Sequence, residues 1–449
     1  MKTRVRAHNP SPPSKHDFPS HYKKTTLPNG LRVVTEQIPH VRSVTIGVWV
    51  DVGSRDEDSR TNGITHFIEH MVFKGTSNRS MREISRSIES VGGYMNAFTS
   101  KEHTCFYARI LDDHTRLGMD VLADLVQNAL FPEKELEKEK GVVIEELRNA
   151  EDDPDDIIHD YLEKAIFGSH PMGFPVIGTE QNLRRFTTRD LREYQKNHYI
   201  PSRIVVAAAG NVDHDEIADL AQGLFTRGGA KPKSGSRRKP AARHGEVVEM
   251  EKPIQQAHIS LGTTTFSVKH KGRYPLMVMN SLLGDGMSSR LFQNIRERYG
   301  FAYSVYSFVS LLSDTGTFGA YIGTDKAHIS ASTELLLKEL DTLKRKPVSR
   351  GELKRTKEQL KGSMMLSLES IPGRMMRLGS SELYFQKLSP LDSILQQIDA
   401  VTSDDIQNLA NSLFKEDKFS RVVFTPNGLS AAETALALAA KNKERRHDS

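Results

Sequence analysis

Two histidines and a glutamate in the first part of the chain have the spacing of a metal site. The segment from His66 to His70 reads His-Phe-Ile-Glu-His and lies in a stretch with helical periodicity near residues 61–73. In an α-helix, His66 and His70 lie one turn apart on the same face, so both imidazoles can bind a single ion. Glu69 lies on the same side, where its carboxylate can take a proton from a metal-bound water. The pattern predicts a metal site that activates water.

A third ligand is predicted in a later helix, which contains the candidates Glu139, Glu145 and Glu146. On a helical wheel, Glu145 lies opposite the apolar stripe and is expected to be solvated. Glu139 and Glu146 lie at the edge of the stripe, where a carboxylate is costly to bury without a partner. Because they are seven residues apart on one line, one can bind the ion while the other supports a ligand. Pairing with Lys138 or Arg148 is the alternative.

Two imidazoles, one carboxylate and a water form the open four-coordinate arrangement of catalytic zinc, not the closed arrangement of structural zinc. Zinc lowers the pKa of its bound water to about 7 and polarises a carbonyl group. The sequence therefore predicts one Zn²⁺ per chain and a hydrolytic reaction of the inverted His-x-x-Glu-His type, a zinc peptidase signature. The motif alone leaves another interpretation open, in which both histidines are surface or hydrogen-bonded core residues of an amphipathic helix.

The elements that carry these residues occur twice along the chain. A strand-like run at 43–50 precedes the histidine helix, and a second strand and two further helices follow. The same order returns about 210 residues later, starting with a strand-like run at 257–261. Chance resemblance between two halves is the alternative to duplication. The pattern predicts an α+β fold of two tandem homologous domains, each a mainly antiparallel sheet with helices packed on one face.

The second copy lacks the predicted ligands. The segment that aligns with the histidine motif runs from Leu276 to Asn280, and Ser363 stands near the position of Glu146. One copy is therefore expected to be catalytic and the other free of metal.

Local composition sets the expected boundaries between the domains. Residues 1–24 contain four prolines, and residues 227–245 are rich in Gly, Pro and Lys. The predicted organisation is an extended basic arm (1–24), a zinc-binding catalytic domain (25–226), a flexible linker (227–245), a metal-free homologous domain (246–427) and a helical or disordered tail (428–449).

Composition excludes several other classes of protein. The 449 residues include 62 basic and 57 acidic side chains, a net charge of +5, and the charges are interspersed. Nucleic acid is not an expected partner, and the run Arg237-Arg238-Lys239 is expected to be solvated. No apolar run is long enough to span a bilayer, so no membrane association is expected. The single Cys105 favours a reducing compartment. We expect a cytoplasmic protein, with the mitochondrial matrix as the alternative.

Several motifs together resemble the pitrilysin/insulysin family of zinc peptidases. The sequence is most similar to short members related to the catalytic subunit of mitochondrial processing peptidase and to their bacterial counterparts. The resemblance covers residues 26–425 and rests on the segments Pro28 to Val33, Gly63 to Thr76, Gly92 to Thr99, Glu139 to Glu146, Gly173 to Thr179 and Ser288 to Phe292.

The resemblance implies a role for each residue of the motif. His66, His70 and Glu146 would be the zinc ligands, Glu69 the catalytic base and Glu139 the carboxylate that supports a ligand. These roles agree with those argued from the helical wheel.

The resemblance also implies roles in substrate binding. Arg296 and Tyr303, in the metal-free half, would reach the substrate, with Tyr303 helping to stabilise the oxyanion. The strand that contains Asn96, Ala97, Phe98 and Thr99 would bind an extended peptide by edge addition. An unfolded polypeptide substrate is implied.

The function implied is that of a zinc-dependent endopeptidase for short or unfolded polypeptides. The alternative is a non-catalytic scaffold or assembly subunit that retains a metal site. The short run Gly284 to Met287 stands where the family's non-catalytic processing partner has a long glycine-rich loop, which disfavours that role. Family members of this size enclose a chamber between two chains, which implies a homodimer or a heterodimer with a related subunit.

Overall fold

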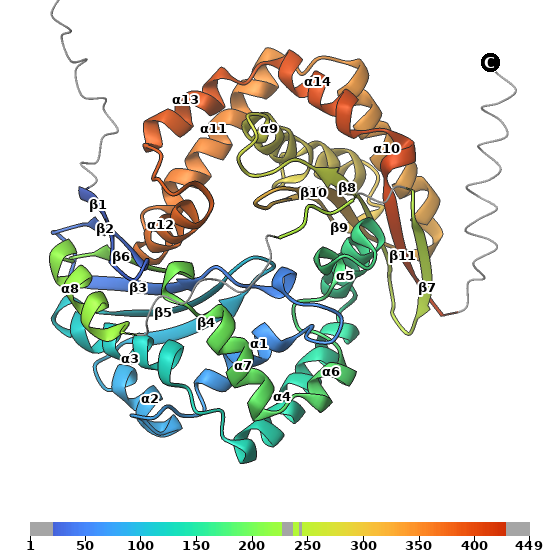
Figure 1. Cartoon of the computed structure of the whole chain (residues 1–449). Helices are drawn as coiled ribbons and strands as arrows, with labels where there is room; N and C mark the ends of the chain where they lie inside the picture. Colours follow the sequence, from blue (N-terminus) through green and yellow to red (C-terminus); the bar gives the residue numbers. More distant parts are fainter. Residues whose placement is uncertain (1–20, 227–236, 242–244, 428–449) are drawn as a thin grey trace, which may run out of the picture.

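The chain folds into two halves, each with one β-sheet and helices packed against it (Figure 1). The structure is a computed structural model, and it describes residues 21–226, 237–241 and 245–427. Most of the predicted arm and the whole predicted tail lie outside the described residues.

The first sheet is built, within the described residues, from the strands β1 (His21–Thr26), β2 (Arg32–Gln37), β3 (Ser43–Val50), β4 (Tyr94–Thr99), β5 (Thr104–Leu111) and β6 (Ile204–Gly210). Their order across the sheet is β1-β2-β6-β3-β5-β4. Strands β2 and β6 are parallel, and every other neighbouring pair is antiparallel. Strand β4 therefore forms one edge of this sheet.

The second sheet contains β7 (Val247–Lys252), β8 (Ala257–Thr265), β9 (Ala302–Leu311), β10 (Gly316–Thr324) and β11 (Ser420–Pro426). Their order is β7-β11-β8-β10-β9, and the parallel pair is β7 with β11. This order matches β2-β6-β3-β5-β4 of the first sheet strand for strand, including the place of the parallel pair. The predicted α+β fold of two similar, mainly antiparallel halves is confirmed.

Helices follow the strands in both halves. The first half has α1 (Ile64–Val72), α2 (Met81–Glu89), α3 (Thr115–Asn128), α4 (Glu133–Asp152), α5 (Pro154–Phe167), α6 (Glu180–Arg185), α7 (Thr188–His198) and α8 (His214–Leu224). The second half has α9 (Arg273–Gly284), α10 (Ile329–Arg345), α11 (Arg350–Ser367), α12 (Ile371–Phe385), α13 (Leu391–Ala400) and α14 (Ser403–Leu413). No helix in the described part of the chain is both long and apolar enough to cross a bilayer.

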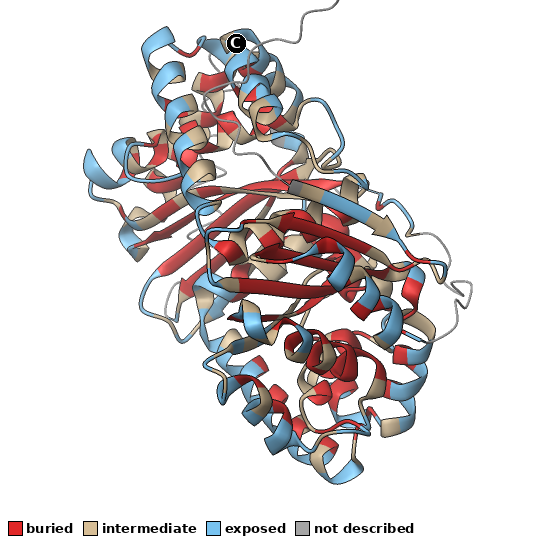
Figure 2. Ribbon diagram, turned by 90° about the vertical axis from the view of Figure 1, so that its left-hand side faces the viewer, coloured by how far each residue is buried: buried red, intermediate tan, exposed pale blue. Residues whose placement is uncertain are grey.

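The middle of the first sheet is buried on both faces. Every one of the seven residues of β6 is buried, and its sequence Ile-Val-Val-Ala-Ala-Ala-Gly is apolar throughout. Because side chains alternate along a strand, Val206 packs in the core beneath α1 and α3, whereas Val205 faces the opposite side. Buried residues concentrate in the strands and exposed residues on the outer helices (Figure 2).

A helix from the opposite half covers the second face of each sheet. Helix α12 packs on β2, β3 and β6, and α5 packs on β8 and β11. Beneath α12, the Trp49 indole Nε1 donates to Met375 Sδ at 3.3 Å. Gly379 leaves room for the indole, since a Cβ there would lie 2.2 Å from Trp49 Cε2. Each half thus contributes one helix that packs on the sheet of the other half. This exchange of helices comes in addition to the predicted helices on one face of each sheet.

Two observations bear on the predicted boundaries, which stay a prediction. Residues 21–24, assigned to the extended arm, belong to β1, whose antiparallel register with β2 runs from His21 opposite Gln37 to Thr26 opposite Arg32. The reason is that β2 would otherwise be an edge strand with unpaired backbone groups.

The end of the predicted flexible linker is held against the first half. Arg237, expected to be solvated, forms ion pairs with Asp51 at 2.9 Å and with Asp56 at 2.8 Å. The guanidinium of Arg55 donates to the Arg238 carbonyl oxygen at 2.9 Å. The carboxylates that pair with Arg237 lie far from it in the sequence, so the basic run alone does not predict these ion pairs.

His103, in the turn between β4 and β5, lies in an aromatic cluster between the two halves. Its ring centroid is 5.1 Å from that of Trp49, 6.0 Å from Phe98 and 6.2 Å from Tyr384 of α12. Its Nδ1 is buried without a hydrogen-bond partner among the described residues. A protonated imidazole is therefore poorly accommodated at this position.

This environment predicts a pH-dependent contribution to stability. Burial lowers the pKa of His103 to about 4, with Arg237 acting in the same direction and Glu102 against it. Because the unfolded chain takes up the proton near pH 6.5, stability present above that pH is lost as the pH falls toward 4. In urea unfolding, His103→Phe should gain about 2 kcal/mol relative to the unsubstituted chain between pH 7 and pH 5. A difference between the two proteins that stays constant over this range would contradict the prediction.

Candidate metal centre

Helix α1 carries the histidine motif, and its apolar residues fix which face the motif occupies. Ile64, Phe67, Ile68 and Met71 are buried in the core of the first half. The remaining side of the helix therefore presents the three polar residues of the motif, each only partly buried. The predicted helix and its predicted polar face are both present in the structure.

The two histidines and Glu146 of α4 come together across the gap between α1 and α4. Glu146 Oε1 lies 3.7 Å from His66 Nε2, and Glu146 Oε2 lies 3.4 Å from His70 Nε2. The three ligand atoms lie within 4.8 Å of one another, and no other such group of His, Cys, Asp or Glu occurs among the described residues. The donors of a tetrahedral zinc site, at about 2.0 to 2.1 Å from the ion, are about 3.4 Å apart. The donor types and the two separations between Glu146 and the histidines fit zinc.

The ionisation of the three groups also suits a metal. Burial and the neighbouring His70 lower the pKa of His66 to about 4, so its ring is neutral and its lone pair is free for coordination. The hydrogen bond with His70 lowers the pKa of Glu146 and keeps this carboxylate charged. Burial acts to lower the pKa of His70, but the hydrogen bonds to Glu139 and Glu146 raise it to about 9. Metal binding at His70 is therefore coupled to release of a proton.

Glu139 supports His70 from behind. It is buried, with Oε1 at 3.0 Å from His70 Nδ1 and Oε2 at 2.7 Å from Lys74 Nζ. Although burial favours the neutral acid, His70 and Lys74 hold the pKa of Glu139 below its usual value. A carboxylate on Nδ1 fixes the tautomer that presents Nε2 to a metal. Sequence reasoning did not assign Lys74, although its place four residues after His70 was a usable signal.

Glu69 is held by a residue of the edge strand. Thr99 Oγ1 donates to Glu69 Oε2 at 2.5 Å, which links α1 to β4. Burial raises the pKa of Glu69, and the Thr99 hydroxyl acts in the opposite direction. Thr99, which the sequence predicts only as a substrate contact, therefore has a second contact, to the predicted base.

Comparison with known proteins places the chain in a family. Residues 32–180 match the family described as Insulinase (Peptidase family M16), and residues 185–360 match the Peptidase M16 inactive domain. The chain is 46% identical over 406 residues to the uncharacterized zinc protease YmxG of Bacillus subtilis, covering 90% of this chain and 98% of that protein. The chain belongs to the M16 peptidase family. The resemblance inferred from the motifs is thus confirmed.

Further relatives of this M16 chain include a plant protein and a bacterial one. It is 34% identical over 399 residues to a probable mitochondrial-processing peptidase subunit beta of Arabidopsis thaliana, covering 86% of this chain and 75% of that protein. The crystal structure of a protease from Helicobacter pylori aligns with a TM-score of 0.83 at 23% identity, covering 91% of this chain and 100% of that one. This structural likeness supports the fold.

The second half of the M16 chain contains the counterparts of α1 and α4. Helix α9 follows β8 as α1 follows β3, and there Leu276 and Met279 are buried apolar residues. Ser363, on α11, is exposed. A half without ligands agrees with the match to an inactive domain. That match begins at residue 185 and so includes β6 of the first sheet; the predicted domain boundaries remain a prediction.

The predicted substrate strand of the M16 chain is the edge strand β4. It pairs with β5 alone, so the backbone on its other side is free of a strand partner among the described residues. Asn96 donates to the Tyr94 hydroxyl at 2.7 Å and accepts from the Ala97 backbone N–H at 2.8 Å. Phe98 packs edge-on against Trp49. Peptide binding at this edge stays a prediction.

Arg296 and Tyr303 lie together in the second half. The Arg296 guanidinium is 5.5 Å from the centre of the Tyr303 ring and 4.8 Å from that of Phe292. The Tyr303 side chain is 73% exposed. Within the described ranges, neither residue has a hydrogen bond or ion pair to α1 or α4. Their contact with substrate also stays a prediction.

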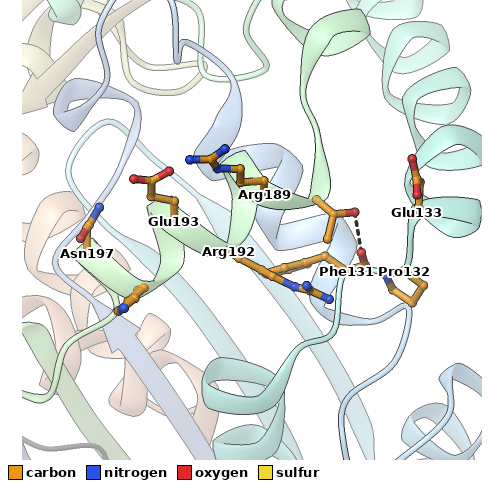
Figure 3. Close-up of a pocket in the computed structure, with 9 residues that line it drawn as sticks. Phe131, Pro132, Glu133, Arg189, Arg192, Glu193 and Asn197 are labelled. Carbon is orange, nitrogen blue, oxygen red and sulfur yellow. Dashed lines mark hydrogen bonds between the residues drawn. The ribbon is translucent and has the colours of Figure 1, made fainter.

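A cavity of about 770 Å³ lies between α7 and the start of α4. It is lined by Phe131, Pro132, Glu133, Thr188, Arg189, Arg192, Glu193, Lys196 and Asn197 (Figure 3). None of the metal-site residues lines it, so it is not the candidate active site. Thr188 donates to the Phe131 carbonyl oxygen at 2.9 Å, and Arg192 to that of Leu130 at 2.8 Å. These bonds fix the segment that leads into α4.

Proposed function

We propose that this M16 chain is a zinc-dependent endopeptidase that hydrolyses peptide bonds of short or unfolded polypeptides. The observation that carries the proposal is the convergence of His66, His70 and Glu146, in which Glu146 lies 3.7 Å from His66 Nε2 and 3.4 Å from His70 Nε2. Glu69 stands beside this cluster without being one of its donors. That combination supports hydrolysis over a purely structural metal site.

The side chains in and around the cluster would have different roles in hydrolysis. Zinc held by His66, His70 and Glu146 would polarise the substrate carbonyl and lower the pKa of a bound water to about 7. Glu69 accepts the proton of the attacking water and returns it to the leaving amine nitrogen. Thr99 fixes the carboxylate of Glu69 through its hydroxyl group, so the base is held in one orientation.

Substrate binding is assigned to backbone and side-chain groups from both halves. An extended peptide would add to the free edge of β4 along Asn96 to Thr99, and its backbone hydrogen bonds depend little on sequence. Only an unfolded or short chain can present such a strand. Arg296 and Tyr303 would contact the peptide backbone and the oxyanion.

The proposal includes a dimer and a cellular location. Two copies of the chain would enclose the substrate, and a related subunit is the alternative partner, which the name of the Arabidopsis relative as a beta subunit supports. The bacterial relatives favour the cytoplasm over the mitochondrial matrix.

Metal removal tests the proposal directly. The purified chain should contain one zinc ion, cleave components of a peptide mixture, lose cleavage after treatment with a chelator and regain it when zinc is added back. Metal analysis and mass-spectrometric mapping of the products measure these outcomes. Cleavage that continues in chelator would refute the zinc mechanism. Tight peptide binding without any products would favour the scaffold interpretation instead.

A further inference from the structure

Glu57 is a buried acidic residue that the proposed mechanism does not use. It lies in the segment that leads into α1, and only 4% of its surface is exposed. Its carboxylate accepts hydrogen bonds from the backbone N–H of Gly63 at 2.8 Å and of Thr65 at 2.9 Å, and from Asn62 Nδ2 at 3.0 Å. Every partner is a donor, so the group acts purely as an acceptor.

These bonds replace a cap that α1 lacks. The first N–H groups of a helix have no partner within the helix and usually bond to the side chain of the residue before it. In α1 that residue is Gly63, which has no side chain, and the first turn contains no acidic residue. Glu57 supplies the missing acceptor from outside the helix. In its ionised form, the carboxylate also places a negative charge at the positive end of the helix dipole.

A second set of contacts holds the same end of the helix from the other side. Asn62 Nδ2 also donates to the Pro175 carbonyl oxygen at 2.9 Å, and Asn182 donates to the Asn62 carbonyl oxygen at 3.0 Å. Gly63 adopts a left-handed φ of +96°, and a Cβ there would lie 2.8 Å from Gly178 Cα. The start of α1 is thus clamped between Glu57 and the segment before α6.

The clamp adjoins the metal site directly. Thr65, which donates to Glu57, is followed by the predicted ligand His66, and His70 lies one turn further along α1. A rotation of α1 by about 20° would move a side-chain atom near the helix surface by about 2 Å. Metal–ligand distances tolerate only about 0.2 Å. A small rotation at the first turn of α1 would therefore move the histidine side chains by more than metal–ligand distances tolerate.

We propose that Glu57 is a positioning residue for the metal centre, whose carboxylate fixes the first turn of α1 and so sets His66 and His70 relative to Glu146. The inference rests on the proposed function because it takes the three donors to be a zinc site. It assigns metal affinity and coordination geometry, not only stability, to a residue that touches neither metal nor substrate.

Burial shows why the carboxylate and its donors depend on each other. Desolvation raises the pKa of Glu57 to about 7, while the bonds from Thr65, Gly63 and Asn62 act to lower it. A charge in this position is costly unless those donors are present. An amide at residue 57 would retain one acceptor but direct its N–H₂ group at a backbone donor, so both helix bonds cannot form.

The test compares Glu57→Gln with a matched control, Glu36→Gln. Glu36 is equally buried, with 2% of its surface exposed, and pairs with Arg374 of α12 at 2.5 Å, away from α1. The readouts are zinc affinity by competition with a chromophoric chelator, the visible spectrum of the Co²⁺-substituted protein, and the unfolding midpoint of the metal-free chain.

Both substitutions should lower the unfolding midpoint, but only Glu57→Gln should weaken zinc binding, by about 10- to 100-fold, and alter the Co²⁺ spectrum. Glu57→Asp keeps a shorter acceptor and should give an intermediate loss; it replaces Glu57→Gln if the latter does not fold. A folded Glu57 variant with unchanged affinity and spectrum overturns the inference. If the unsubstituted chain itself binds no zinc, the proposed function fails instead.

Discussion

Glu69→Gln is expected to lower kcat/KM for peptide cleavage by about 10²- to 10⁴-fold while the zinc content stays unchanged. Glu69 is not among the three converging donors, so its replacement leaves the predicted ligands in place. Glutamine has the same size and can still accept the hydrogen bond from Thr99, but its amide cannot take a proton from water. Steady-state cleavage of a fluorogenic peptide, together with metal analysis of the same preparation, measures both quantities.

Thr99→Val provides a graded comparison for this prediction. It removes the hydroxyl group that lies 2.5 Å from Glu69 but leaves the carboxylate, so a smaller loss of about tenfold is expected. Thr99→Ser retains the hydroxyl and should restore most of the activity. Glu69→Gln with normal cleavage would remove Glu69 from the mechanism, and Glu69→Gln that also loses zinc would make Glu69 a ligand.

The periodicity of the local sequence was sufficient to predict the two helices that carry the candidate metal site. The spacing of the motif in α1 predicts that His66 and His70 share one face, and the wheel of α4 predicts that Glu139 and Glu146 lie at the edge of its apolar stripe. The structure brings these side chains together. Helical geometry fixes which residues share a face, and a carboxylate at the edge of an apolar stripe needs a partner. These arguments require only residues that are near in sequence.

Contacts between segments that are distant in the sequence could not be predicted from local periodicity. The exchange of α5 and α12 between the two sheets joins residues such as Trp49 and Met375, which are 326 positions apart in the sequence. Arg237 appeared solvated because its carboxylate partners, Asp51 and Asp56, lie in the first half. Thr99 carries no signal for its bond to Glu69, since a threonine in a strand is ordinary.

The two similar halves show why the fold and the candidate site must be predicted separately. Both halves have the same strand order with a single parallel pair. The chemistry depends on a few side chains, and the second half lacks them at Leu276 and Ser363. A shared fold therefore does not predict a shared site, and the site must be argued from its own residues.

Glu146→Gln is expected to remove zinc from the purified chain and with it all measurable cleavage. Glu146 supplies the only carboxylate of the converging group, and it comes from α4, whereas both histidines come from α1. Without it, the two imidazoles on one helix remain, and they provide neither the third donor nor the negative charge that offsets the ion. Zinc content by elemental analysis and peptide cleavage are the two measurements.

Two further glutamates of α4 make the Glu146 prediction specific. Glu145→Gln changes the adjacent exposed carboxylate, which pairs only loosely with Arg148 at 3.7 Å, and should leave zinc and cleavage unchanged. Glu139→Gln keeps all three donors but loosens His70, so zinc affinity should fall by about 10- to 100-fold without being abolished. The order Glu146, Glu139, Glu145 follows from their contacts: Glu146 belongs to the converging donor group, Glu139 bonds to the far side of the His70 ring, and Glu145 pairs with Arg148. Equal effects of Glu145→Gln and Glu146→Gln would mean that charge on α4, not coordination by Glu146, holds the metal.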